Sequence, residues 1–366
     1  MKNSTYQITV IAALLLSFTF IKGDGDWQII KAKNEIAGRS ECGMAACNGK
    51  LYLIGGGAIT TEVFDPSTLT WTGKAKAPVD MNHFQPVSYQ DKIYVLEAFT
   101  QGEYPAQPNL KSVYIYDTGK DTWTEGGSLP EERSRAAAGA ALYNGKLYLV
   151  AGIQHGHTSG TTNMFDEYDA VTGKWKALPD APHIRDHCAA AVIKDKLYVA
   201  GGRNTSYHEP GNFMSFFGKT VLEVDCYDFK SAQWSTLAAK LPLGSGGGSM
   251  VNLQDKLYYM GGERATDKEA NAPRKNVFWL DPSTGDQWKE TSSLQEARNG
   301  MSAAVLNNKI YVFGGAGGGQ GPGPGGPGGP PRQPGQSNDT MHRPPPPRRE
   351  EGPRPGSPLE VFAINN

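Results

Sequence analysis

The chain has 366 residues, with 36 Lys and Arg against 37 Asp and Glu and a formal net charge of −1. This balance, without a Lys/Arg cluster within the body of the chain, excludes the electrostatic footprint of a nucleic-acid-binding protein. Gly is abundant, at 45 residues, and short stretches alternate apolar and polar residues, which favours an all-β fold.

The first residues predict an export signal. A Lys at position 2 precedes an apolar run from Ile8 to Ile21, and Lys22 and Gly23 follow it. The run is too short for a comfortable membrane span and fits a secretory signal peptide over residues 1–23. We therefore expect a secreted or periplasmic protein with no membrane span after cleavage. The alternative is an uncleaved anchor.

Residues 24–366 contain one pattern that occurs six times, which indicates a repeat architecture. Each copy runs through a polar turn into a strand such as LYVAGG, then through a loop into a third strand and a Trp. The aromatic residue of the second strand marks the copies at Tyr52, Tyr94, Tyr148, Tyr198, Tyr258 and Tyr311. Four copies carry an Arg thirteen residues before that marker, at Arg39, Arg135, Arg185 and Arg298. An acid closes most third strands, as in Tyr116-Asp117, and a Trp such as Trp123 opens the fourth.

In four copies the second strand ends on a Gly pair, at Gly55-Gly56, Gly201-Gly202, Gly261-Gly262 and Gly314-Gly315. This Gly pair, together with the Tyr-Asp, the Trp and the Arg in register, resembles the kelch repeat. The resemblance implies a single domain in which each repeat is a four-stranded blade and six blades ring a central channel, a six-bladed β-propeller. Trp27 begins a strand with no earlier blade, and residues 359–364 (LEVFAI) read as a third strand without its Trp strand. We expect these two strands to pair and complete blade six. Such closure leaves no free sheet edge, so we expect a monomer.

The four cysteines are predicted to be free. Cys42 and Cys47 are five residues apart on one strand, so their side chains point to opposite faces and lie too far apart for a disulfide. Cys188 falls on a first strand and Cys226 on a third, with another strand between them. The thiols therefore read as small buried hydrophobic groups.

A Gly/Pro/Arg-rich segment interrupts blade six at residues 316–358. It lacks the apolar residues needed for packing, so we predict a disordered insertion with polyproline II character in its Pro runs. A role in adhesion or cell-wall contact through its Arg residues is one interpretation. A tolerated surface insertion without a function is the other.

The resemblance also indicates where function lies. In kelch propellers the loops after the Gly pairs and the turns before the innermost strands open on one face, and loops on a rigid frame carry function. Glu41 lies at one of these turns. The candidate ligand-binding residues that the repeats place at this mouth are Arg39, His83, Arg135, His155, His157, Arg185, Asp186, Arg203, Asn204, Tyr207, His208, Arg264, Arg298 and Asn299. The kelch arginines have an alternative role, which is bonding to carbonyls and acids of the blades.

Catalytic roles are open at the same face. Glu263, Glu209 and His187 are candidates for a general acid or base. His155 and His157 are weak candidates for metal ligands, with His187, His208 or Glu209 as further ligands from adjacent loops. No other cofactor is expected. The repeats are similar to the propeller of galactose oxidase, but the Tyr-His pair of that family's copper site begins an innermost strand. Here Tyr207-His208 follows a Gly pair, so copper-radical oxidation is not expected.

The size and the signal peptide look like the secreted kelch sialic-acid mutarotases of bacteria, and only the class of chemistry carries over. We predict a secreted protein that recognises a glycan or a protein segment at the loop-bearing mouth. The alternative is a carbohydrate-active enzyme with mutarotase-like or epimerase-like acid/base chemistry on a small sugar. Asn204-Thr205-Ser206 is a glycosylation sequon, and a glycan there would crowd the mouth and count against the enzyme.

Overall fold

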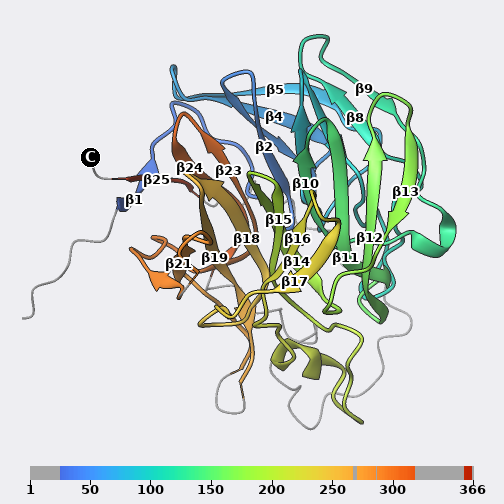
Figure 1. The fold of residues 1–366 in the computed structure, drawn as a ribbon. Helices are drawn as coiled ribbons and strands as arrows, with labels where there is room; N and C mark the ends of the chain where they lie inside the picture. Colours follow the sequence, from blue (N-terminus) through green and yellow to red (C-terminus); the bar gives the residue numbers. More distant parts are fainter. Residues whose placement is uncertain (1–24, 267–269, 286, 318–357, 365–366) are drawn as a thin grey trace, which may run out of the picture.

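The computed structural model describes residues 25–266, 270–285, 287–317 and 358–364 (Figure 1). The predicted signal peptide and residues 318–357 of the predicted insertion lie outside these residues and stay predictions. Among the described residues, no helix has the length and apolar character required to cross a membrane.

Six antiparallel sheets arranged around a channel make up the described fold, which confirms the all-β, six-bladed propeller. In blades one to five, the chain passes from the innermost strand outward. Blade one contains β2 (Gly43–Cys47), β3 (Lys50–Ile54), β4 (Thr60–Asp65) and β5 (Thr70–Lys76). Blade two contains β6 (Val87–Tyr89), β7 (Lys92–Val95), β8 (Tyr114–Asp117) and β9 (Thr122–Glu125). Blade three contains β10 (Gly139–Tyr143), β11 (Lys146–His155), β12 (Ser159–Asp169) and β13 (Lys174–Leu178).

Blades four and five follow the same order, and blade five has an additional short strand. Blade four contains β14 (Asp186–Ile193), β15 (Lys196–Arg203), β16 (Asp225–Asp228) and β17 (Gln233–Thr236). Blade five contains β18 (Gly246–Leu253), β19 (Lys256–Arg264), β21 (Val277–Leu280) and β22 (Lys289–Glu290), with the short β20 (Ala272–Pro273) beside β19. Two short 3₁₀ helices, η1 (Glu131–Arg133) and η2 (Phe213–Gly218), lie in connections.

Blade six joins the two ends of the chain. Its strands are β23 (Arg298–Leu306), β24 (Lys309–Gly317), β25 (Leu359–Ile364) and, outermost, β1 (Gly25–Ile30). β1 and β25 pair antiparallel and lie side by side in Figure 1. Trp27 is opposite Phe362, with 5.3 Å between the ring centroids. The expected closure by the first and last strands is confirmed.

The acid that follows the third strand forms a turn. Asp117 Oδ1 accepts hydrogen bonds from the backbone N–H groups of Gly119 and Lys120, at 3.1 and 2.9 Å. Asp169 and Asp228 make the same pair of bonds in their blades. Asp is favoured here because its side chain caps the backbone of a tight turn. These turns lie at the opposite end of the blades from the Gly pairs, since each strand reverses direction.

In blades two to five, the Trp that opens the outer strand connects neighbouring blades. The indole Nε1–H of Trp123 donates to the carbonyl oxygen of Ala75 at 3.4 Å, and that of Trp175 donates to Gly127 O at 3.2 Å. Trp234 and Trp288 donate to Pro179 O and Ala239 O in the same way, at 2.7 and 3.2 Å. An indole N–H taken out of water usually finds such an acceptor, so in these four blades the Trp joins the blade to the one before it.

The cysteines and the loop of blade three can also be compared with the sequence predictions. All four cysteines are free and buried, as predicted. The repeat pattern places a loop after the second strand of each blade, but in blade three residues 153–163 extend β11 and β12 as a hairpin with its turn at Gly156–Thr158. Gly156 permits that turn because its φ of +55° is in the left-handed region. The hairpin holds His155 and His157 at its tip, in defined positions.

Candidate functional site

The four kelch arginines are buried inside their own blades. Each donates to the backbone carbonyl sixteen residues later, which belongs to Gly55, Ala151, Gly201 or Gly314. Each also lies beside an acid on its third strand, and in blade four Arg185 Nη2 is 2.7 Å from Asp225 Oδ2. The same kinds of partner recur in all four blades. These contacts therefore stabilise the blades, and we assign no ligand-binding role to Arg39, Arg135, Arg185 and Arg298.

Two residues after each of these arginines, the chain turns into the innermost strand. The six equivalent residues all have φ between +52° and +66°: Glu41, His83, Ala137, His187, Gly247 and Gly300. Their backbones link blade to blade. The N–H of Glu41 donates to Gly300 O at 2.6 Å, and that of His83 donates to Glu41 O at 2.9 Å. This conformation suits glycine, and other residues adopt it at a cost that is often associated with function.

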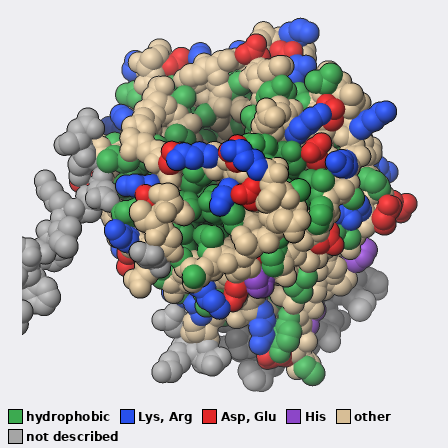
Figure 2. All heavy atoms as spheres, in the orientation of Figure 1, with side chains coloured by type: hydrophobic (Ala, Val, Ile, Leu, Met, Phe, Trp, Pro, Cys, Tyr) green, Lys and Arg blue, Asp and Glu red, His purple; other side chains and the backbone are tan. Residues whose placement is uncertain are grey.

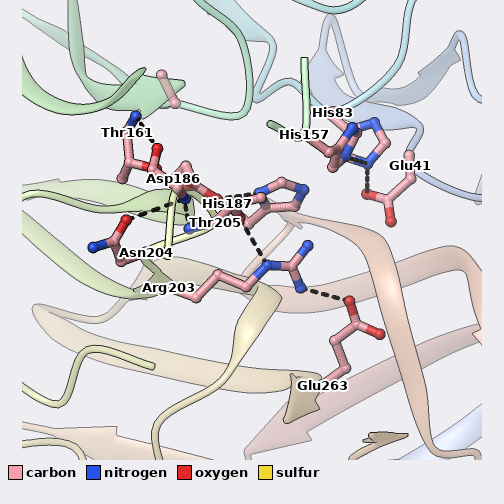
Figure 3. A network of polar contacts seen from close by, with 12 residues as sticks. Glu41, His83, His157, Thr161, Asp186, His187, Arg203, Asn204, Thr205 and Glu263 are labelled. Carbon is pink, nitrogen blue, oxygen red and sulfur yellow. Dashed lines mark hydrogen bonds and ion pairs between the residues drawn. The ribbon is translucent and has the colours of Figure 1, made fainter. Parts of the chain in front are cut away.

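Three side chains from this ring and one from blade three meet at the mouth of the channel. Glu41, His83 and His187 line a cavity of about 60 Å³. His157 reaches them from the tip of the β11–β12 hairpin, and its Nε2 is 3.3 Å from His83 Nε2. One nitrogen from each of the three histidines lies within 4.8 Å of the others. Figure 3 shows His83 and His157 beside Glu41, with His187 directed toward them.

Oxygen acceptors hold the outer nitrogens of two of these rings. His187 Nδ1 is 2.6 Å from Asp186 Oδ1, and His83 Nδ1 is 2.7 Å from Asn82 Oδ1. Asp186 is itself fixed, because Thr205 N and Thr161 Oγ1 donate to its Oδ2 at 2.9 and 2.6 Å. The ring orientations are therefore set by contacts outside the cluster.

An ion pair lies beside the histidines. Arg203 Nη1 is 2.6 Å from Glu263 Oε1, and the guanidinium stacks over Phe217 of η2, 4.7 Å from the ring centroid. Glu263 Oε2 accepts hydrogen bonds from Asn299 Nδ2 and Asn271 Nδ2, both at 2.8 Å. Three predicted residues, Arg203, Glu263 and Asn299, thus form one network (Figure 3 shows the first two).

Burial controls the electrostatics of the cluster. Desolvation, with a smaller effect of Glu263, raises the pKa of Glu41 to about 8. Desolvation and the charge of Arg203 lower the pKa of His157 to about 3. The pKa values of His83 and His187 lie well below 6.5, chiefly through burial, and nearby Arg203 and His157 act in the same direction. The three imidazoles are therefore neutral near pH 7.

A second hollow lies further out, between the loop that carries η2 and the β19–β20 connection. These segments project together at the bottom of Figure 1, and Ala265 N donates to Phe217 O at 3.0 Å. The hollow has a volume of about 340 Å³. We call it the rim groove; its lining is Glu209, Asn212, Met214, Ser215, Gly218, Lys219, Arg264, Ala265 and Thr266.

The remaining predicted residues border the rim groove or lie apart from the histidines. His208 bridges two loops, with its Nδ1 2.7 Å from Phe213 O and its Nε2 2.8 Å from Thr158 O. Tyr207 is exposed, and Lys219 Nζ lies 4.2 Å from its ring centroid. Asn204 Oδ1 accepts a hydrogen bond from Ser206 N within the same loop. His155 is exposed and is not one of the clustered histidines, so the His155–His157 metal pair is not assembled.

Several residues of the mouth were not predicted. Tyr104 and Phe99, from the blade-two loop, both pack on the His157 ring with centroids 5.0 Å apart. The Tyr104 hydroxyl lies 3.7 Å from Met214 Sδ, which connects the histidine cluster to the rim groove. Thr205 and Asn82 orient the cluster. Glu41 was placed at this face from the sequence, and it occupies the same position in its repeat as His83 and His187 do in theirs.

Comparisons with known proteins agree with this architecture. The KLHDC2/KLHL20/DRC7 Kelch-repeats domain matches residues 101–262, and the Kelch motif matches residues 38–76. "Kelch-like protein terF" of Aspergillus terreus is 27% identical over 291 residues, covering 76% of this chain and 61% of its own. "Beta-scruin" of Limulus polyphemus is 26% identical over 216 residues, 57% of this chain and 22% of its own.

Two further matches extend the comparison. "Kelch-like protein 23" of Pongo abelii is 28% identical over 273 residues, covering 72% of this chain and 43% of its own. This chain thus spans less than two thirds of the length of each of these relatives. The solved structure of YjhT aligns with a TM-score of 0.65 at 16% identity, covering 79% of this chain and 94% of that one.

The sheets, the channel and the repeated Arg, Asp and Trp contacts define a six-bladed β-propeller with a loop-bearing mouth. The chain belongs to the kelch-repeat β-propellers. That membership fixes the architecture and leaves the ligand to be argued from the mouth.

Proposed function

We propose that this propeller is a recognition protein whose ligand lies in the rim groove, and that the ligand is a carbohydrate. The groove's volume of about 340 Å³ falls within the range of small-ligand sites, roughly 300–1,000 Å³. This hollow between loops of adjacent blades is the observation that carries the proposal. A propeller frame with loop-borne contacts is also the usual arrangement of kelch binding proteins.

The chemistry around the groove supports a sugar. The lining contains one acidic residue, Glu209, and two basic residues, Lys219 and Arg264. Neutral hydrogen-bonding groups come from Asn212 and Ser215. Such convergent polar groups fix the orientation of a hydroxylated ligand.

Flat apolar surface lies beside the groove. Tyr207 and Phe213 are exposed residues, at 37% and 39% of their full accessible surface. An exposed ring with an apolar face gives stacking surface at low entropic cost. The combination of a ring face with convergent hydroxyl-binding groups is the one that a sugar requires.

Charge supports the same class of ligand. On the face shown in Figure 2, Lys and Arg side chains alternate with Asp and Glu instead of forming a patch of one sign. A mixed surface of this kind provides no extended field for a polyanion. A neutral or weakly charged ligand matches it better.

The test is saturation-transfer NMR of the purified protein with a panel of neutral and acidic monosaccharides. We expect transfer to at least one sugar, and loss of most of the signal in Arg264→Ala and in Tyr207→Ala. The matched controls are Lys120→Ala and Val171→Ala, which alter exposed residues of the turns at the opposite end of the blades.

Each outcome separates the alternatives. Transfer that the control variants reduce as much as Arg264→Ala would place the ligand elsewhere. Catalysed anomeric exchange in the same spectra would establish the alternative of an enzyme acting on a small sugar. Silence toward every sugar, together with binding of an extended peptide that Tyr207→Ala weakens, would replace the carbohydrate with a protein segment.

A further inference from the structure

We propose that His83, His157 and His187 bind a divalent transition-metal ion of the zinc type at the channel mouth, with the Glu41 carboxylate as the fourth ligand. The inference goes beyond the recognition proposed for the rim groove, since none of the four residues lines that groove. Three imidazoles with one carboxylate form a donor set that suits zinc and its neighbours.

Distances between donor atoms fit one ion. Bond lengths of roughly 2.0–2.1 Å in a tetrahedral site separate two imidazole nitrogens by about 3.3 Å. His83 Nε2 and His157 Nε2 are 3.3 Å apart, and Glu41 Oε2 is 3.6 Å from His83 Nε2. The full set of histidine donors spans 4.8 Å, so binding requires side-chain shifts of about 1 Å.

The supporting contacts are those of a metal centre. Metal-bound histidines almost always donate their second ring N–H to a carboxylate or another oxygen, which fixes the tautomer. Asp186 has this relation to His187, and the Asn82 side-chain oxygen has it to His83. Both rings thereby keep a proton on Nδ1 and direct the Nε2 lone pair into the cluster.

Two nitrogens of the cluster have no hydrogen-bond partner among the residues that the structure describes. They are His187 Nε2 and His157 Nδ1, and these two residues are 6% and 3% exposed. A buried polar atom without a hydrogen bond is costly, and native structures rarely retain one without an ion, a water or a function to account for it. A cation coordinated by the cluster would satisfy His187 Nε2. It would also give a reason for retaining the buried His157 ring, and with it His157 Nδ1, at this position.

The backbone gives an independent argument. His83 and His187 occupy the left-handed turn that blades five and six fill with Gly247 and Gly300. Placing imidazoles there incurs a strain that glycine avoids. Gly300 also leaves room for Glu41, since a Cβ at residue 300 would approach Glu41 Oε1 to 2.2 Å.

Nearby charges are compatible with a cation. The positive charge of Arg203, which lowers the pKa of both His83 and His187, is paired with Glu263 at 2.6 Å. Asp186 contacts His187 directly, and Glu41 lies on the open side by the cavity of about 60 Å³. That volume accommodates an ion and about one or two waters.

The experiment is titration of the chelator-treated full chain with ZnCl₂ by calorimetry, and with CoCl₂ by visible absorption. We expect one ion per chain and the intense d–d bands of a four-coordinate Co²⁺ ion. His83→Ala and His187→Ala should each weaken binding at least 100-fold. Asp186→Asn should weaken it roughly 10–100-fold through the loss of the carboxylate behind His187.

The matched control is His155→Ala, which removes an exposed histidine from the same hairpin as His157 and should leave the affinity unchanged. Circular dichroism checks that each variant folds. If an alanine variant does not fold, the Co²⁺ spectrum of the parent chain still decides, because histidine coordination shifts the bands from those of the aquated ion. No stoichiometric binding by the parent chain, or equal loss in His155→Ala, would overturn the site.

Discussion

Two positions of the repeat lie two residues apart and behave differently. The first carries Arg39, Arg135, Arg185 or Arg298, always buried with the same carbonyl and acid partners. The second carries six residues of one backbone conformation but of varied chemistry, from glycine to glutamate. Four of the six blades keep the Arg because they share its contact, whereas blades two and five carry Met81 and Ser245 there. The repeat varies the second position, where the side chain faces the channel and is free to be specialised.

The largest expected effect is at the first position. Arg185→Ala should destabilise the fold by about 3–5 kcal/mol, because it leaves Asp225 as a buried charge without its cation. His187→Gly should cost less than about 2 kcal/mol, since relief of the left-handed turn offsets part of the lost packing. Urea unfolding followed by Trp fluorescence measures both. Equal losses would remove the distinction between the two positions.

A substitution at Gly300 tests whether the second position is sterically specialised. Gly300→Ala should destabilise by about 1–3 kcal/mol, because the residue has φ +62° and the new Cβ meets the Glu41 carboxylate. The matched control is Gly285→Ala, a surface glycine at φ +76° with no atom within 4 Å of the added Cβ. Its loss reports the backbone strain alone, so the difference between the variants measures the clash. Thermal melts of the two proteins suffice.

The opposite change should stabilise. Ala137 occupies the same turn at φ +55° without offering a functional group, so Ala137→Gly relieves strain. Its greater freedom in the unfolded chain opposes that gain, and we expect a net stabilisation of up to about 1 kcal/mol. Chemical denaturation resolves this difference when the parent chain is unfolded alongside. A clear destabilisation would show that the Ala137 methyl group has packing that glycine cannot replace.

The smallest expected effect is on thiol labelling of Cys42 and Cys188, each of which directly follows one of these turns. Burial raises the pKa of Cys42 to about 12 and that of Cys188 to about 12. Because the thiolate is the reactive form, only roughly 10⁻⁴ of either group is ionised at pH 8. Labelling with a disulfide reagent should therefore be negligible in the native protein and should reach four thiols after unfolding. Fast labelling of Cys188 in His187→Gly would show that this turn also holds the strand.

The sequence predicts the blades well because their determinants are local. The Asp that caps a turn and the Trp that reaches the preceding blade recur at fixed offsets, so register follows from reading one repeat. The pairing of β1 with β25 was also accessible, since each end held an incomplete blade. The hairpin tip at Gly156 was not, because its strands continue beyond the usual repeat length.

The site was predictable only in part, for a geometric reason. His83, His157 and His187 were all candidates, but the predicted metal pair was His155 with His157, and His83 was not among the further ligands considered. Residues separated by two along a hairpin do not share a site when its tip turns between them. His83 and His157 come from neighbouring blades, two and three, and the packing of one blade on the next brings them together. The partners that orient the cluster, such as Asn82 and Thr205, carry no signature in the repeat.

The shared construction of blade six has a consequence for synthesis. Glu360 on β25 is the acid partner of Arg298, at 2.6 Å, so even the innermost strand of that blade awaits one of the last residues described. Until β25 emerges from the ribosome, β1 and β24 each present an unpaired edge, and such edges invite pairing with other chains. Every prematurely ended copy should therefore be an open arc that aggregates, rather than a smaller propeller.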